Sequence, residues 1–155
     1  MTELHPEHRL TELGLTLPPQ RAAVGNYVGA VQDGDLVLVA GHGPFEGPKQ
    51  LYKGKLGREI DVAAGYAASR ATILSALSSL KTLIGDLNRV RRIMRVYGMV
   101  NSVPEFERHP EVIDGASDLL VELFGDRGRH ARCAVGFVSL PFNMPVEIEM
   151  TVAVR

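Results

Sequence analysis

The sequence is poor in several residue types, and each shortage excludes a class of protein or site. A single cysteine, Cys133, among 155 residues excludes an internal disulfide and any zinc site built from several cysteines. The absence of tryptophan and the 6% aromatic content give no sign of a stacking platform for single-stranded nucleic acid. Seventeen basic and eighteen acidic residues leave a net charge of −1, so the chain lacks the positive charge of many nucleic-acid-binding domains.

Long apolar runs are also missing. No stretch approaches the ~18 apolar residues of a membrane span, and the N-terminus has no apolar segment of signal-peptide type. We therefore expect a cytoplasmic protein that has no membrane partner. The 45% apolar content and the length indicate one globular domain with a substantial core.

Hydrophobic spacing divides the chain into an N-terminal part and one folded domain. Residues 1–20 are predicted to form a helix, with Pro6 in its first turn and Gly14 at its end, followed by a connector. Residues 21–155 are predicted to form a single domain. Its elements follow the order hairpin, helix, strand, helix and hairpin, at residues 22–41, 61–84, 89–101, 110–124 and 132–154.

These elements predict an α+β fold with two long helices on one face of a sheet. The second strand of the first hairpin, residues 36–40, is apolar throughout, so we expect it to be covered on both faces. The first long helix follows Asp61 as its N-cap and has an apolar face for the sheet opposite a face of small residues. The sheet face without helices carries alternating apolar residues, so we expect subunits to associate through it.

The closing segment, residues 132–154, is predicted to form a β-hairpin. Apolar residues at every second position from Val146 predict a strand with one buried face, and residues 141–145 have the composition of a turn. One strand opens on Arg132, and the other carries Glu147 and Glu149. Taken alone, a cation and carboxylates on paired strands indicate a surface salt bridge.

Three other features each allow a structural and a functional interpretation. The segment Gly41-His42-Gly43-Pro44 is a turn or a close approach of backbone to a ligand, and we prefer the turn. The basic loop of residues 44–59 is solvated surface or, over residues 45–58, a mobile flap. The arginines of the strand at 89–101 form an exposed face or contact RNA, and the neutral net charge favours the exposed face.

The closing segment also carries a recognisable motif. Ala131-Arg132-Cys133-Ala134-Val135, Leu140-Pro141 and Val146-Glu147-Ile148-Glu149 follow, at the same spacing, the pattern Ala-Arg-(Ser/Thr)-x-Val, Leu-Pro, Val-Glu-Ile-Glu. Together with Gly25-Asn26-Tyr27 and Ala40-Gly41, the matching segments span residues 22–154. The chain thereby resembles the Rid family (RidA/YjgF type, also labelled endoribonuclease L-PSP), in particular its longer-chain branch.

This resemblance implies a fold and an assembly. Members of the family have a trimeric, chorismate-mutase-like architecture, in which a mixed β-sheet carries two long helices on one face. Three subunits pack their sheets together, and a ligand cleft lies at each interface. The resemblance therefore implies a homotrimer with sites between subunits.

The resemblance also implies an activity. The family's deaminases hydrolyse reactive enamines and imines such as 2-aminoacrylate to 2-keto acids and ammonia, without a metal or a cofactor. By this match, Arg132 holds the substrate carboxylate and Glu147 orients the attacking water. Tyr27 and Gly41 line the cleft, together with Ala134 and Asp114.

Some positions depart from the family pattern, and they keep other functions open. Cys133 stands where serine or threonine is usual, and Ala134 where a cysteine often stands, so no thiol nucleophile is expected. Asp114 stands where shorter members have asparagine, and it disfavours an anionic ligand if it faces the cleft. The alternatives are a non-catalytic binder of small carboxylates such as 2-keto acids, and an endoribonuclease, which scattered histidines and a neutral charge make the weakest candidate.

Overall fold

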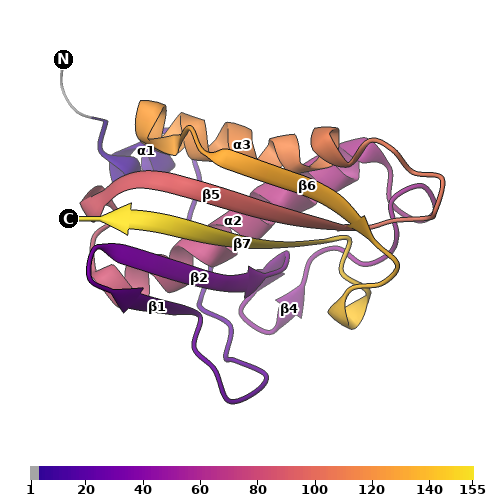
Figure 1. Ribbon diagram of the computed structural model, residues 1–155, viewed down its shortest axis with the longest axis horizontal. Helices are drawn as coiled ribbons and strands as arrows, with labels where there is room; N and C mark the ends of the chain where they lie inside the picture. The colour runs from indigo at the N-terminus through magenta and orange to yellow at the C-terminus, as the bar shows by residue number, and fades with distance from the viewer. Residues whose placement is uncertain (1–3) are drawn as a thin grey trace.

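A computed structural model describes residues 4–155 and shows a five-stranded sheet with both long helices on one face (Figure 1). The helices are α1 (Pro6–Glu12), α2 (Val62–Ile84) and α3 (His109–Phe124). The strands are β1 (Ala30–Asp33), β2 (Leu36–His42), β3 (Phe45–Glu46), β4 (Lys49–Gln50), β5 (Val90–Asn101), β6 (Ala131–Phe137) and β7 (Val146–Val154). Within residues 4–155, no helix combines the length and the apolarity needed to cross a membrane.

The strand order is β1-β2-β7-β5-β6, and β6 runs parallel to β5 while the other neighbours are antiparallel. The prediction of a hairpin over residues 132–154 is therefore wrong, because β5 lies between β6 and β7 (Figure 1). The connection between them passes across the end of β5. There the N–H of Asn101 donates to the carbonyl of Pro145 at 2.9 Å, and the N–H of Ser102 donates to that of Phe137 at 3.3 Å.

Helix α2 lies beside α3 on the sheet, where α2 packs over β2 and β7 and α3 packs over β5 and β6. Asp61 caps it as predicted, because its carboxylate accepts a hydrogen bond from the N–H of Ala64 at 2.8 Å. The face of small residues is buried as well as the apolar face. Its serines are at most 9% exposed: Ser69, Ser75, Ser78 and Ser79. Small side chains let neighbouring segments approach the helix closely, and this closeness shapes the candidate site described below.

The two long helices also touch at a glycine. A Cβ on Gly115 of α3 would collide with the carbonyl oxygen of Tyr66 of α2. Gly115 thus allows a backbone contact between the helices that a larger residue would prevent. The pair is further joined by Arg70 and Glu122, whose two hydrogen bonds measure 3.1 and 2.9 Å.

The face of the sheet without helices is open in the single chain. Leu36 and Leu38 of β2 are 44% and 56% exposed, so the prediction that β2 is covered on both faces is wrong for one chain. Val37 and Val39, which alternate with them, are buried beneath the helices. The continuous apolar run of β2 therefore reflects one face in the core and one face that residues 4–155 leave uncovered.

The basic loop has more structure than the sequence indicates. It contains the small hairpin β3–β4, and Leu56 is fully buried, so the segment is anchored to the domain. Lys55 donates to the side-chain oxygen of Asn101 at 2.7 Å and also to the carbonyl of Val138. These anchors argue against a flap that moves as one piece.

The arginines of β5 have partners within the chain. Arg91 lies 3.1 Å from Asp35, and Arg95 lies 4.0 Å from Glu149. Arg92 donates to the carbonyl of Arg129 at 3.2 Å. This pairing agrees with the preferred interpretation of an exposed, internally balanced strand face.

We predict that Gly115→Ala destabilises the protein by about 1–3 kcal/mol, because the new methyl group has to displace the backbone of α2. The free energy of unfolding in urea, measured at one protein concentration, tests this expectation. Gly25→Ala serves as the control, because its nearest neighbours would lie at 3.5 Å and its expected effect is within about 0.5 kcal/mol. Equal stability of the two variants would contradict the close helix contact.

Candidate functional site

Arg132 lies on the helix-covered face of the sheet. It is opposite Val96 in the β5–β6 register, and Val96 is fully buried beneath the helices. One terminal nitrogen of the guanidinium donates to the carboxylate of Asp114 at 2.8 Å and to the hydroxyl of Ser117 at 3.1 Å. Its other N–H groups make no hydrogen bond within residues 4–155. One edge of the fork is thus occupied by α3, and the other edge is available to a ligand.

His130 continues this network and fixes its direction. Nδ1 of His130 lies 2.6 Å from the carbonyl of Gly128, which can only accept, so Nδ1 carries the proton. Nε2 therefore accepts from the hydroxyl of Ser117 at 3.0 Å, which leaves the Ser117 oxygen to accept from Arg132. Burial lowers the pKa of His130, and the nearby Arg132 lowers it further, in keeping with a neutral ring.

Arg132, which the resemblance assigns to the substrate carboxylate, forms an ion pair with Asp114 in the single chain. The surface salt bridge with the glutamates of β7 is wrong, because those side chains point to the other sheet face. Asp114 faces Arg132, which is the arrangement in which its negative charge would disfavour an anionic ligand at Arg132. Ala134 follows on the same face of β6 and packs against the core beside this network.

Glu147 lies on the open face of the sheet. It alternates with the buried Val146 and Ile148 along β7 and is opposite Met99 of β5. Its carboxylate sits directly against Gly41 of β2, where a Cβ would collide with Oε1. The side chain makes no hydrogen bond within residues 4–155. Burial raises the pKa of Glu147, and repulsion from Glu149 raises it further.

Gly41 and Tyr27 line a cleft of about 380 Å³ between residues 20–29 and the end of β2. Tyr27 is half exposed, and its phenol oxygen accepts from the N–H of Val24 at 3.4 Å. The structure thus brings Tyr27 and Gly41 together in this cleft and places the Glu147 carboxylate against Gly41. We define this group as the Glu147 half-site, and the group around Arg132, Asp114 and Ala134 as the Arg132 half-site.

His42 forms the wall of the Glu147 half-site next to α2. Its Nδ1–H donates to the carbonyl of Ala40 at 2.6 Å, so Nε2 accepts from the hydroxyl of Ser79 at 2.8 Å. The amide of Gln20 donates to the same hydroxyl at 3.4 Å. Burial lowers the pKa of His42, against the effect of the Ala40 carbonyl. Gly41 and His42 belong to β2, so the preferred interpretation of the segment as a turn is wrong for them, and Gly41, His42 and Gly43 line the cleft.

One chain does not bring the two half-sites together. Arg132 is level with Val96 on β5, whereas Glu147 is level with Met99. Two strand spacings across and three residues along separate their backbones by roughly 14 Å. Their side chains also point to opposite faces. Cys133, next to Arg132, points to the open face, as alternation predicts, but it is only partly buried there.

Sequence reasoning missed the residues that complete the cleft. Ser75 and Ser79 are one helical turn apart, which was visible only as part of a small-residue face. Arg21 precedes the Gly25-Asn26-Tyr27 motif and carried no sequence signal. Its guanidinium carbon lies 3.9 Å from the ring centre of Phe45, at the edge of the Glu147 half-site.

Metal ligands do not gather in the described part of the chain. Among residues 4–155, no three histidine, cysteine or carboxylate side chains are grouped so that they could hold a metal ion. The histidines of the domain are instead each paired with a serine. These pairs are His42 with Ser79, His109 with Ser102 and His130 with Ser117.

Comparison with known proteins places this geometry in a family. Residues 7–151 match the family described as "YjgF/chorismate_mutase-like, putative endoribonuclease". The chain belongs to the YjgF/RidA family. The protein TCP17 of Trypanosoma cruzi is 41% identical over 144 residues, which cover 92% of this chain and 90% of that protein.

Solved structures agree with this placement. The protein Atu1372 of Agrobacterium tumefaciens, described as of unknown function, is 43% identical with a TM-score of 0.90, over 97% of this chain and 92% of that chain. A putative endoribonuclease of Shewanella oneidensis is 38% identical with a TM-score of 0.93, and the match covers 97% of this chain and 99% of that chain. YjgF of Escherichia coli, at 19% identity and a TM-score of 0.63 over 90% and 98%, shares the fold.

The raised pKa of Glu147 predicts how stability depends on pH. Ionisation of this carboxyl opposes folding, and the penalty develops as the pH rises above its unfolded value of about 4.3. Glu147→Gln removes the penalty. We therefore expect the variant to unfold at a higher temperature than the wild type at pH 7, with a difference that vanishes below about pH 4.

Thermal unfolding between pH 3.5 and pH 7, at one protein concentration, measures this difference. The exposed Glu105 supplies the control, because Glu105→Gln should follow the wild type throughout. A wild type that is more stable than Glu147→Gln at pH 7 would mean that the fold stabilises the ionised carboxylate, contrary to its surroundings.

Proposed function

We propose that this YjgF/RidA-family protein hydrolyses enamines and imines such as 2-aminoacrylate to 2-keto acids and ammonia. We further propose that it acts as a homotrimer, with each site formed from the Arg132 half-site of one subunit and the Glu147 half-site of another. The observation that carries the proposal is the separation of a half-open guanidinium and an unbonded, partly buried carboxylate onto opposite faces of one sheet. Arg132 can hold a substrate carboxylate, and Glu147 can accept a proton from the attacking water, so a site that brings the two groups together would supply both functions.

The residue types suit the reaction. A guanidinium fork matches a carboxylate with two parallel hydrogen bonds, and its unoccupied edge gives Arg132 this capacity. An iminium carbon is already electrophilic, so hydrolysis requires a positioned water and an acceptor for its proton. Burial and Glu149 raise the pKa of Glu147, which makes that carboxylate a better proton acceptor than an ordinary glutamate.

The proposed reaction converts an enamine and one water molecule to a 2-keto acid and ammonia. The enamine first tautomerises to the imine, and the imine nitrogen takes up a proton from solvent to give the iminium form; the proton released in the last step returns to solvent. The water oxygen then attacks the iminium carbon, the electron pair of the C=N bond moves to nitrogen, and the water gives one proton to Glu147. Glu147 returns that proton to the amine, the C–N bond breaks, and ammonia leaves as the hydroxyl releases its proton to form the ketone. Arg132 holds the carboxylate in place throughout.

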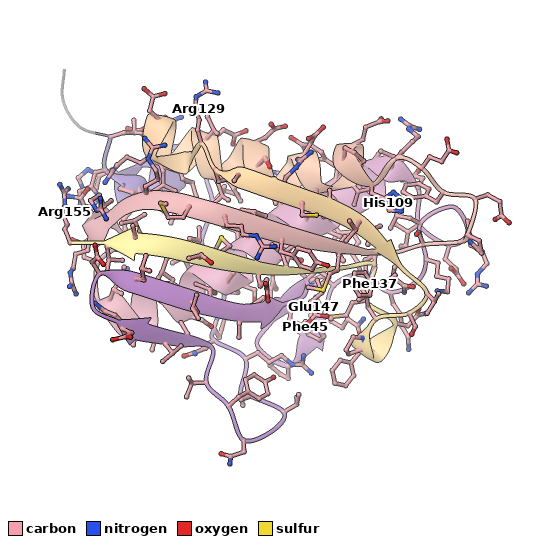
Figure 2. The ribbon with its side chains drawn as sticks, viewed as in Figure 1. Phe45, His109, Arg129, Phe137, Glu147 and Arg155 are labelled. Carbon is pink, nitrogen blue, oxygen red and sulfur yellow. The ribbon has the colours of Figure 1, made fainter. Side chains whose placement is uncertain are left out.

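We predict that Arg132→Ala lowers the rate of imine hydrolysis at least about 100-fold, because the substrate carboxylate loses its partner. A pyridoxal-phosphate lyase acting on serine generates 2-aminoacrylate, and keto-acid release is timed with and without the protein. Arg129→Gln is the matched control, since Arg129 is 70% exposed and lies at the opposite end of the sheet from Glu147 (Figure 2). Full activity of Arg132→Ala would show that the site is assigned wrongly.

The same assay tests whether two subunits share a site. Arg132→Ala and Glu147→Gln subunits, each inactive alone, are co-expressed with different tags and isolated as mixed assemblies. If neighbouring subunits share each site, every mixed trimer holds one intact site of three, so mixing restores about one third of the wild-type activity. If one chain holds the whole site, mixing restores none.

A second candidate function, a non-catalytic binder of small carboxylates, is favoured by the ion pair between Asp114 and Arg132. A ligand carboxylate would share the guanidinium with Asp114 and be repelled by it. Such a site suits reversible binding of 2-keto acids as well as turnover. The lyase assay separates the two functions, because a binder saturates with keto acid and leaves the rate of imine hydrolysis unchanged.

We predict that Asp114→Asn tightens the binding of 2-oxobutanoate about tenfold, because it removes the competing charge and keeps a hydrogen-bond acceptor for Arg132. Isothermal titration measures the affinity. Asp118→Asn is the control, because Asp118 lies one helical turn away and accepts from the Tyr66 hydroxyl at 2.7 Å. Unchanged affinity in Asp114→Asn would mean that the ligand does not share Arg132 with Asp114.

A further inference from the structure

Arg21 is held between two aromatic rings at the edge of the cleft. Its guanidinium carbon lies 3.9 Å from the ring centre of Phe45 and 4.7 Å from that of Phe142. The two rings meet edge to face, with their centres 6.3 Å apart. Cation–π attraction to both rings fixes the position of the guanidinium without using its N–H groups as hydrogen-bond donors to oxygen.

Those N–H groups have no other partner. Among the arginines of residues 4–155, Arg21 is the one that makes neither a hydrogen bond nor an ion pair within the chain. A guanidinium carries five N–H donors, and Arg21 is partly withdrawn from solvent. The two rings therefore hold the Arg21 guanidinium in a fixed place, while its N–H groups have no hydrogen-bond acceptor within residues 4–155.

The turn that supplies Phe142 is itself firmly held. Phe142 and Asn143 have φ angles of 58° and 53°, in the left-handed region that residues other than glycine rarely adopt. The amide of Gln50 donates to the carbonyl of Phe142 at 3.0 Å, and the N–H of Gly54 donates to that of Asn143 at 2.8 Å. The side chain of Asn101 bonds that of Asn143 at 3.0 Å. A strained turn bonded from three segments gives the Arg21 clamp a rigid base.

A second unassigned donor lines the same cleft. Ser75 of α2 is only 5% exposed, yet its hydroxyl makes no hydrogen bond within residues 4–155. The residue lines the cleft, so its hydroxyl can donate a hydrogen bond to a ligand there. Arg21 and Ser75 thus give the 380 Å³ cleft a positive charge and a hydroxyl, which together favour an oxyanion as ligand.

We infer that Arg21 is a second anion-binding residue of this site, and that the ligand is a dicarboxylic 2-keto or 2-imino acid. The inference rests on the proposed function, in which Arg132 of a neighbouring subunit holds the carboxylate next to the reacting carbon. Arg21 lies in the Glu147 half-site, where it would hold the carboxylate at the far end of the ligand. The cleft volume suits an acid of this size.

Isothermal titration with two keto acids tests the inference, with 2-oxoglutarate as the dicarboxylate and 2-oxobutanoate as the monocarboxylate. The wild type is expected to bind 2-oxoglutarate at least about tenfold more tightly. Arg21→Gln should abolish this preference and leave the affinity for 2-oxobutanoate within about twofold. Arg21→Lys, which keeps the charge but loses the planar fork, should retain part of the preference.

The outcomes that overturn the inference are distinct. A wild type without preference for the dicarboxylate overturns it, and so does an equal loss of both affinities in Arg21→Gln, which would mean that Arg21 only fastens the loop. If Arg21→Gln fails to fold, the Arg21→Lys titration decides instead. A partly reduced preference for 2-oxoglutarate supports the inference, and an equal loss of both affinities overturns it. Arg129→Gln is the control for a lost positive charge and should match the wild type.

Failure of the proposed function gives a different result. The titration requires no turnover, so the preference for 2-oxoglutarate is measured whether or not the imine is hydrolysed. Arg132→Ala should weaken both acids, because both share the carboxylate that Arg132 holds. If Arg21→Gln loses the preference for 2-oxoglutarate as expected but the wild type hydrolyses no imine, the proposed deaminase activity is wrong and the anion-binding role of Arg21 is retained.

Discussion

The alternation of side chains along a strand is the constraint on which the candidate site depends. It buries Val146 and Ile148 under the helices and thereby turns Glu147 to the open face of the sheet. The same rule on β6 turns Arg132 toward α3, where Asp114 holds it. A sheet that is covered on one face only thus divides the two chemical groups between its faces. A single chain therefore does not bring the two groups into one site.

Small residues on α2 decide what fills the space at the end of the sheet. Ser79 lets Gly29 approach so closely that a Cβ would lie 2.7 Å from its hydroxyl, and it also orients His42. Gly41 in turn leaves room for the carboxylate of Glu147. A Cβ at Gly29 or Gly41 would therefore collide with Ser79 or with Glu147. The cleft therefore results from a few small side chains on elements whose apolar faces determine the fold.

The sequence predicts where helices and strands lie along the chain better than it predicts which of them are neighbours in space. The periodicity of residues 61–84 and the Asp61 cap locate α2 almost to the residue, because both signals are local. The motif also selects Glu147, Tyr27 and Gly41 as candidates, and the structure places Gly41 beside both the Glu147 carboxylate and the Tyr27 cleft. The position of β6 beside β5 depends on hydrogen bonds from a distant strand, which local pattern does not reveal. The contact of Arg21 with Phe142 has the same origin, since 121 positions of sequence separate the two residues.

Charge balance links the two half-sites. Asp114 offsets most of the positive charge of Arg132, so a ligand with one carboxylate meets a nearly neutral pair there. Across the cleft, Glu147 is held in surroundings that disfavour its ionised form, while Arg21 keeps its full charge without an internal counterion. In the proposed assembled site, the unbalanced positive charge would thus belong to Arg21. A ligand with a second negative charge would gain from this arrangement, because Arg21 would attract the charge that Asp114 and Glu147 repel.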